Sequence, residues 1–216
     1  LEPENVTTVT YEQLATDEEG KHKEYSQLRA ELPIFNRNRI SGDLFRHGIS
    51  LGNYRIVEAK KDDYLLVFHN KEKGGWTNLG RTDDKKRLNT LANILRRYLL
   101  ELNRECETVY VLEPVLVRKT EPFRLLIVLP MWTLRFHSPR FREMCRELLR
   151  SIIPAHLAGR IYWMDEISMQ GFEHCYKLLM RALTNSYLAD YSAQLLEVIY
   201  ELLGKAVEIQ TLDDTN

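Results

Sequence analysis

The stretch FRLLIVLPMWTLRFHSPRFREMCRELLRSIIP, residues 123–154, holds the clearest structural pattern of the chain. Its first part, Phe123–Leu129, is a nearly continuous apolar run, which is typical of a strand that is covered on both faces or lies centrally in a sheet. Ser138 and Pro139 then favour a helix start, because serine is preferred at the N-cap and proline at the first helical position. We predict that this helix ends at Pro154. On its apolar face we expect Phe141, Met144, Cys145, Leu148 and Ile152.

Strand and helix patterns flank this stretch on both sides. Two apolar runs around the polar turn 60–63 predict a β-hairpin, and a helix that begins at Thr82 or Asp83 carries leucines at spacings of three and four. Two C-terminal helices begin their apolar faces at Met169 and Leu188. The predicted strands are Tyr54–Ala59, Tyr64–His69, Val109–Val117 with a bend or bulge at Pro114, Phe123–Leu129 and Arg160–Met164.

From residue 64 to 164 the predicted order is strand, helix, strand, strand, helix, strand. This βαββαβ order predicts an α+β fold of the ferredoxin-like type, in which two helices cover one face of an antiparallel sheet. Tyr54–Ala59 would add an edge strand, and the two C-terminal helices would pack alongside. The domain division we expect is an extended or helical N-terminal arm over 1–50, an α+β domain over 51–205 and a flexible tail over 206–216.

The composition excludes several classes of protein. Of the 216 residues, 44% are hydrophobic and 28% charged, which is typical of a soluble globular protein and not of disordered, collagenous or rod-like chains. No apolar run approaches the ~18 residues needed to span a bilayer. Three widely spaced cysteines predict buried, reduced thiols. The chain begins at Leu1 without a signal-peptide pattern, which indicates a segment of something longer.

Charge is balanced overall but unevenly distributed. Thirty Lys and Arg against 31 Asp and Glu give a net charge of -1, so no overall field attracts nucleic acid or acidic lipid. Residues 1–32 carry 3 basic and 8 acidic side chains, whereas residues 81–160 carry 16 basic and 9 acidic ones. The acidic arm and the basic centre can attract each other, or each can face a different neighbour.

The sequence contains none of the common catalytic motifs: no pair of histidines four apart around a carboxylate, no G-x-S-x-G, no phosphate-binding glycine loop. Cys145 with His156 could form a nucleophile–base pair, and Glu166 with Glu173 a carboxylate pair. Packing of the thiol and solvation of the glutamates are the stronger interpretations. We therefore predict no catalytic residue, no cofactor-binding residue and no metal ligand, and a protein that is not an enzyme.

Two features suggest protein docking instead. Arg142, Arg146 and Arg150 recur every four residues and form one ridge; they either pair within the chain, with Glu166, Glu173 or the acidic arm, or face an acidic partner protein. Nucleic acid is the least favoured partner, because no exposed aromatics are interleaved with the arginines. The aromatic link over residues 129–136 either caps the core or docks a partner through tryptophan and arginine. The docking candidates are Trp132, Arg135, Phe136, Arg142, Arg146 and Arg150.

A series of short strings leads to a family resemblance. They are Phe123-Arg124, Val128-Leu129-Pro130-x-Trp132-x-x-Arg135-Phe136, Phe141-Arg142, Glu147-Leu148-Leu149-Arg150, Pro154-Ala155-His156-Leu157, Tyr162-Trp163-Met164, Met169-x-x-Phe172-Glu173-x-x-Tyr176, the upstream Leu102-Asn103-Arg104-x-Cys106-Glu107-x-x-Tyr110-x-x-Glu113 and the late helix Leu195–Leu203. Together they resemble a module of the large baseplate proteins of contractile, phage-tail-like injection systems, of the antifeeding-prophage or virulence-cassette type. The resemblance covers roughly residues 85–203; Ser151-Ile152-Ile153 departs from it, because many relatives have an acidic residue there.

The resemblance implies a structural role without catalysis or cofactor, as a baseplate wedge or adaptor that contacts other baseplate, tube or sheath proteins in a multi-subunit assembly. It brings no small-molecule substrate. It implies synthesis and assembly in the cytoplasm and a place in a released or membrane-docked particle. Residues 1–50 match no part of the family. The alternative is a ferredoxin-like regulatory or nucleic-acid-binding domain that uses the basic ridge Arg135–Arg150.

Overall fold

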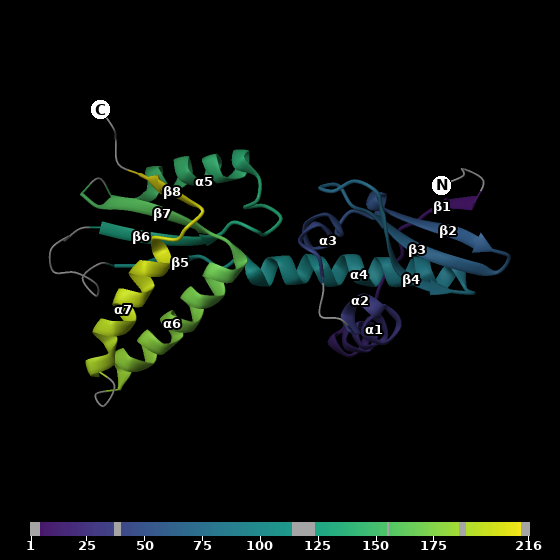
Figure 1. Ribbon diagram of the computed structural model, residues 1–216, viewed down its shortest axis with the longest axis horizontal. Coiled ribbons are helices and arrows are strands. Elements are labelled where there is room, and N and C mark those ends of the chain that lie inside the picture. The colour runs from purple at the N-terminus through teal and green to yellow at the C-terminus, as the bar shows by residue number, and fades with distance from the viewer. Residues whose placement is uncertain (1–4, 37–39, 114–123, 155, 186–188, 213–216) are drawn as a thin grey trace. The chain divides into compact units, whose positions relative to one another are not determined.

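The computed structural model describes residues 5–36, 40–113, 124–154, 156–185 and 189–212. The chain divides into two compact units, Leu1–Glu105 and Cys106–Asn216. Each unit contains one four-stranded sheet, with strand orders β1-β2-β3-β4 and β5-β6-β7-β8 (Figure 1). The protein is therefore a mixed α/β chain with two separate sheets and two sets of helices.

The first unit consists of an antiparallel sheet and the helices around it. Its strands are β1 (Val6–Thr8), β2 (Tyr54–Lys60), β3 (Asp63–His69) and β4 (Trp76–Thr82), and its helices are α1 (Glu18–Glu31), α2 (Pro33–Asn36), α3 (Gly42–His47), a 3-10 turn at Leu51–Asn53 and α4 (Lys85–Cys106). The predicted hairpin is confirmed as β2 and β3, joined by a turn in which Asp62 has a φ of 58°. The predicted helix is confirmed as α4, but its start is capped by Asp84, whose carboxylate accepts from the amides of Lys86 and Arg87.

Helix α4 forms the centre of the first core. Its leucines recur at helical spacing, and Leu88, Leu95 and Leu99 are at most 1% exposed. They pack with apolar side chains of β2, β3 and α1. Tyr54 is fully buried in this core, and its hydroxyl donates to the carbonyl of Gly48 at 2.6 Å.

The acidic N-terminal segment packs against the basic side of α4. Glu24 forms an ion pair with Arg97, and Glu31 forms one with Arg87. Acidic residues of the N-terminal segment therefore pair with basic residues of α4 within the first unit. Such attraction was one of the two alternatives predicted from the uneven charge distribution. Because Leu28, among others on this segment, is completely buried in the core, the described part of residues 1–50 belongs to the folded unit; the expected boundary at residue 50 does not coincide with the observed division.

Two asparagines of α4 hold the extended residues that precede α1. The amide of Thr10 donates to Asn89 Oδ1 at 2.8 Å, and the amide of Glu12 donates to Asn93 Oδ1 at 3.1 Å. Asn93 Nδ2 in turn donates to the carbonyl of Thr10 at 2.9 Å. The two side chains therefore pair with this backbone much as a neighbouring strand would, and they satisfy polar groups at the edge of the core.

We expect Asn93→Ala to loosen this segment. Asn93 is 1% exposed, and its loss leaves the amide of Glu12 without its acceptor, a cost of about 1–3 kcal/mol. Hydrogen exchange at Glu12 should become faster, and urea should unfold the first unit at a lower concentration. Thr90→Ala is the control, because the Thr90 hydroxyl contacts only the side chain of Glu12 in this segment. Unchanged exchange at Glu12 would contradict the assignment.

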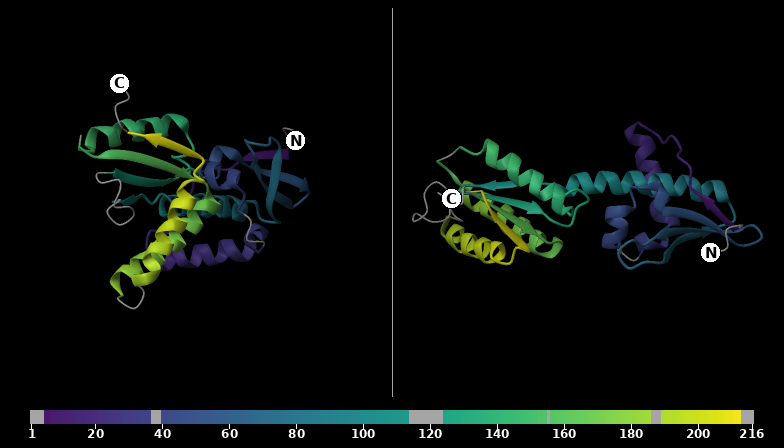
Figure 2. Two further views of the ribbon diagram at one scale, coloured as in Figure 1. Left: turned by 60° about the vertical axis from the view of Figure 1, so that its left-hand side comes forward. Right: turned by 90° about the horizontal axis from the view of Figure 1, so that it is seen from above.

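The second unit is a three-layer sandwich. Its strands are β5 (Tyr110–Leu112), β6 (Arg124–Pro130), β7 (Ala158–Met164) and β8 (Glu208–Thr211), and its helices are α5 (Pro139–Ile152), α6 (Glu166–Thr184) and α7 (Ala189–Leu203). Strands β6 and β7 are parallel, with α5 as their crossover, and the outer pairs are antiparallel. Figures 1 and 2 show α5 on one side of this sheet and α6 with α7 on the other.

Successive side chains of β6 and β7 point to opposite faces of the sheet, so each strand contributes to both cores of the sandwich. Leu126 and Val128 face the cluster that contains α6 and α7, whereas Ile127 and Leu129 face the cluster that contains α5. A strand covered on both faces needs apolar residues at every position. The continuous apolar run of β6 is therefore explained, and the prediction of a doubly covered or central strand is confirmed over residues 124–129.

Several expectations differ from the structure. The ferredoxin-like βαββαβ sheet over residues 64–164 is not confirmed, because β3 lies in the first sheet and β5, β6 and β7 lie in the second. Strand β4 was missed, and residues 208–211 of the expected flexible tail form β8 against β7. Pro114, Phe123 and Leu188 lie outside the described residues.

Candidate functional site

The six docking candidates lie in the second unit, on the link between β6 and α5 and on α5 itself. Phe136 is a core residue with 7% exposure, and its ring lies 5.5 Å from that of Phe141 and 5.6 Å from that of Trp163. Trp132 is half-buried and packs against the cluster that contains α6 and α7. For these two aromatic residues the described contacts are those of core capping.

Arg142 is the most buried of the candidate arginines, with 8% exposure. Its Nη1 donates to the carbonyls of Phe136 and His137 at 3.1 and 3.0 Å, and its Nε donates to Glu208 Oε2 at 3.1 Å. The guanidinium also lies over the Trp163 ring, 5.8 Å from its centre. Arg142 therefore joins the link, α5 and β8.

Arg135 and Arg146 also have acidic partners, and Arg150 is exposed in the last turn of α5. Arg135 Nε donates to Glu107 Oε2 at 2.7 Å, and this hydrogen bond raises the pKa of Arg135 above its usual value. Arg146 pairs with Glu143 and Glu147 on the same helix. Intramolecular pairing was one of the predicted alternatives, but Glu166, Glu173 and the acidic arm, which were the expected partners, are not those observed for Arg135, Arg142 and Arg146. In the described contacts these three arginines pair with Glu107, Glu143, Glu147 and Glu208.

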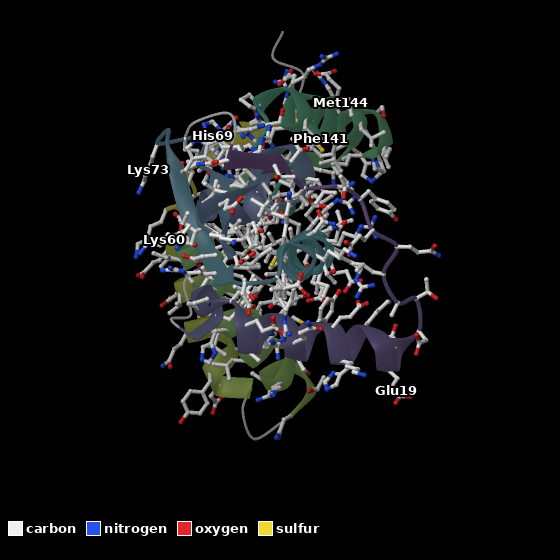
Figure 3. The ribbon with its side chains drawn as sticks, turned by 90° about the vertical axis from the view of Figure 1, so that its right-hand side faces the viewer. Glu19, Lys60, His69, Lys73, Phe141 and Met144 are labelled. Atoms are coloured by element: carbon white, nitrogen blue, oxygen red, sulfur yellow. The ribbon has the colours of Figure 1, made fainter. Side chains whose placement is uncertain are left out.

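The predicted apolar face of α5 is divided in the structure, and three of its residues are exposed. Met144, Leu148 and Ile152 are 61%, 59% and 65% exposed, and Met144 can be followed on the helix in Figure 3. The side of α5 that packs on the sheet is instead centred on Cys145 and Leu149. The apolar residues of α5 cover a wider arc of the helix than the sheet can bury. The sheet therefore covers the side with Cys145 and Leu149 and leaves the side with Met144, Leu148 and Ile152 exposed. We call Met144, Leu148 and Ile152 the α5 stripe.

Both edges of the second sheet also expose apolar side chains. Val111 in β5 and Val109 just before it are 53% and 49% exposed, and Ile209 in β8 and Val207 just before it are 49% and 55% exposed. Edge strands with exposed apolar residues are ready templates for another chain. A shallow pocket adjoins β5 and is lined mostly by apolar side chains of α6 and α7, together with Val111, Leu112 and Glu113.

The cysteine and the two glutamates considered as catalytic candidates, Cys145, Glu166 and Glu173, have surroundings typical of structural residues. Burial raises the pKa of the Cys145 thiol, the opposite of the shift found in nucleophilic cysteines. Glu173 accepts a hydrogen bond from the Tyr110 hydroxyl at 3.1 Å, and burial followed by the Glu173 charge raises the pKa of Tyr110 to about 12. Glu166 is an exposed residue of the first turn of α6. Cys106, Cys145 and Cys175 form no disulfide among the described residues, but they are half-buried and not buried as predicted.

The fold and these surfaces define a mixed α/β protein with apolar side chains exposed on a helix and at two sheet edges. Comparison with models of protein families gives no match, and comparison with curated protein sequences gives none either. None of the helices among the described residues has both the length and the apolarity needed to cross a membrane.

Proposed function

We propose that this chain is a non-enzymatic assembly component, a baseplate wedge or adaptor of a contractile, phage-tail-like injection system, which acts through protein–protein contacts. The observation that carries the proposal is the α5 stripe, three large apolar side chains exposed on successive turns of one helix. The resemblance of residues 85–203 to baseplate proteins supports the same role. The partners are other baseplate, tube or sheath proteins, and the site of action is the assembled particle.

The position of the stripe favours protein docking over a role in folding. Met144, Leu148 and Ile152 are each more than half exposed, so they contribute little to the core of the isolated chain. Interfaces concentrate their binding energy in a few large side chains that become buried on association. Exposed charged residues adjoin the stripe on the same helix: Arg140 lies one turn before Met144, and Glu143 and Glu147, which pair with Arg146, lie beside it, as expected for a polar rim around an apolar centre.

We expect a triple Met144→Gln, Leu148→Gln, Ile152→Gln variant to lose partner capture while keeping its melting temperature. Loss of interface anchors costs more than ~1 kcal/mol each, so recovery of partners should fall at least about tenfold. The measurement is affinity capture of the tagged, full-length protein from extracts of its source at low and moderate salt, followed by mass spectrometry. Ile167→Gln is the matched control, because Ile167 is a single exposed apolar residue on α6 with 83% exposure.

Two outcomes would contradict the proposal. Undiminished capture of tube, sheath or baseplate proteins by the triple variant would remove the stripe as the docking site. Recovery of nucleic acid alone, lost steeply as salt rises, would favour the alternative of a nucleic-acid-binding domain that uses the basic ridge.

A further inference from the structure

Three potential metal ligands from two elements meet in the first unit, far in sequence from the surfaces described above. Asp43 and His47 lie one turn apart on α3, and Glu72 lies on the loop between β3 and β4. One nitrogen or oxygen atom from each of the three residues lies within 4.8 Å of those from the other two. The sequence signal for this cluster is weak. Asp43 and His47 are spaced Asp-x-x-x-His, which matches none of the catalytic motifs considered above.

Asp43 supplies an observation that points to a ligand. Its side chain is only 3% exposed. Oδ2 accepts from the amide of Lys71 at 3.0 Å, but the buried Oδ1 has no hydrogen-bond partner. A buried carboxylate oxygen without a donor is costly, and such oxygens are normally paired or bound to a metal ion.

The imidazole of His47 faces this oxygen at a distance that suits a shared cation. His47 Nε2 lies 3.8 Å from Asp43 Oδ1, which is too long for a hydrogen bond. Nitrogen and oxygen ligands about 2.0–2.2 Å from a tetrahedral zinc ion lie about 3.4 Å apart. A shift of a few tenths of an ångström would therefore allow both atoms to bind one ion.

The surrounding hydrogen bonds hold the three ligands in place. Arg46 Nε donates to Glu72 Oε1 at 3.0 Å, and the loop that carries Glu72 is closed by a hydrogen bond from the Lys73 amide to Asn70 Oδ1. Asn53 Nδ2 donates to the carbonyl of His47 at 2.7 Å. A hydrogen bond to a ligating carboxylate, such as that from Arg46 to Glu72, orients a metal ligand, whereas the other two bonds fix the backbone that carries the ligands. Figure 3 shows Lys73 projecting outward from the molecule.

We propose that Asp43, His47 and Glu72 bind one divalent cation of the first transition-metal row, for which Zn²⁺ is the probe. The two carboxylates and the one arginine carry charges that sum to -1, which favours a dication. An imidazole with carboxylates suits zinc, whereas Mg²⁺ and Ca²⁺ prefer oxygen ligands alone. His47 and Glu72 have side chains that are 31% and 41% exposed, so an ion can reach the site from solvent. This proposal does not depend on the assembly role.

The test is calorimetric titration of the full chain with ZnCl₂, with MgCl₂ in parallel. We expect one Zn²⁺ per chain, and at least tenfold weaker binding in His47→Gln and in Glu72→Gln. His22→Gln, which removes an exposed histidine of α1, is the matched control and should bind like the parent. Melting temperatures without metal show whether each variant is folded; the partly exposed Glu72 keeps the test valid if His47→Gln is unstable.

X-ray absorption of the zinc-loaded protein identifies the ligands independently. Nitrogen and oxygen neighbours at about 2.0–2.2 Å support the site, and sulfur neighbours at about 2.3 Å place the ion on cysteine thiols instead. The proposal is overturned by sulfur ligation, by binding that both variants retain, or by the absence of saturable binding.

Discussion

Trp163→Ala should lower the free energy of unfolding of the second unit by about 3–5 kcal/mol, the usual cost of truncating a buried aromatic residue. Trp163 lies in β7 and has no exposed surface. Its ring packs with that of Phe136, and its Nε1 donates to Gln210 Oε1 of β8 at 3.1 Å. The substitution leaves a cavity at the centre of the α5-side core and removes a hydrogen bond to the edge strand. Urea unfolding followed by circular dichroism measures the effect.

Trp76→Ala is the matched control for this prediction. Trp76 begins β4 and is 43% exposed, with only a ring contact to His69 at 5.0 Å among its described aromatic neighbours. Its removal should change stability by less than about 1 kcal/mol. Hydrogen exchange should locate the effect of Trp163→Ala in residues 124–212. A loss below about 1 kcal/mol for Trp163→Ala would show that this core is not packed as described.

The second large effect is expected for Arg142→Met. The change removes the donor to the buried carbonyl of Phe136 and breaks the ion pair with Glu208. Removing one partner of a buried ion pair costs roughly 3–5 kcal/mol; we expect about 3 kcal/mol, the lower end of that range, because the Glu208 side chain keeps 35% exposure and can be solvated. Methionine keeps an unbranched apolar side chain in place of the arginine stem, so the loss of stability measures the contribution of the guanidinium group. The melting temperature and urea midpoint measure it.

Arg146→Met on the next turn of α5 makes the same chemical change at the surface. Arg146 pairs only with its helix neighbours Glu143 and Glu147 in the described contacts, and both glutamates are more than half exposed. Surface ion pairs of this kind contribute about 0.2–1 kcal/mol. Stability should therefore separate the two arginines of the predicted ridge. Equal losses for the two variants would mean that Arg142 has no special structural role.

Local patterns predicted the elements that depend on neighbouring residues. The hairpin β2–β3 has alternating and apolar runs around a polar turn, and α5 starts at Ser138, whose hydroxyl accepts from the amide of Phe141. The apolar run of β6 also predicted a doubly covered strand. Each of these features is determined by turn chemistry, capping or hydrophobic spacing within about ten residues, which is the range over which a sequence can be interpreted directly.

Long-range pairing could not be predicted from the same patterns. Strand β4 has only Leu79 and Gly80 buried, so its sequence lacks the apolar alternation of a strand. Strand β8 depends on β7, which pairs with it from about 50 positions earlier. The expected ferredoxin-like order was compatible with the element sequence, but that order says nothing about which strands share a sheet, and the structure divides them between two units.

The candidate functional surfaces also depend on long-range contacts that local sequence patterns do not reveal. Phe136 and Arg142 were docking candidates because they belong to the aromatic link and to the arginine ridge, and both are buried in the structure. Helical spacing placed the α5 stripe on one apolar face together with Phe141 and Cys145, but it does not indicate how much of that face the sheet covers. Asp43, His47 and Glu72 were not grouped at all, since a loop 25 residues away completes the cluster. Burial and proximity are properties of the folded chain.

The sequence by itself determined the hairpin, the central helix α4, the doubly covered strand β6 and the starting point of α5, because each depends on contacts between residues that are close along the chain. Only the tertiary structure decided that there are two sheets, that Arg142 is buried against Glu208 while Leu148 is exposed, and that Asp43 faces His47 and Glu72. The physical reason is that burial depends on which distant segments meet, and the free energy of those meetings is shared among many residues that no local pattern contains.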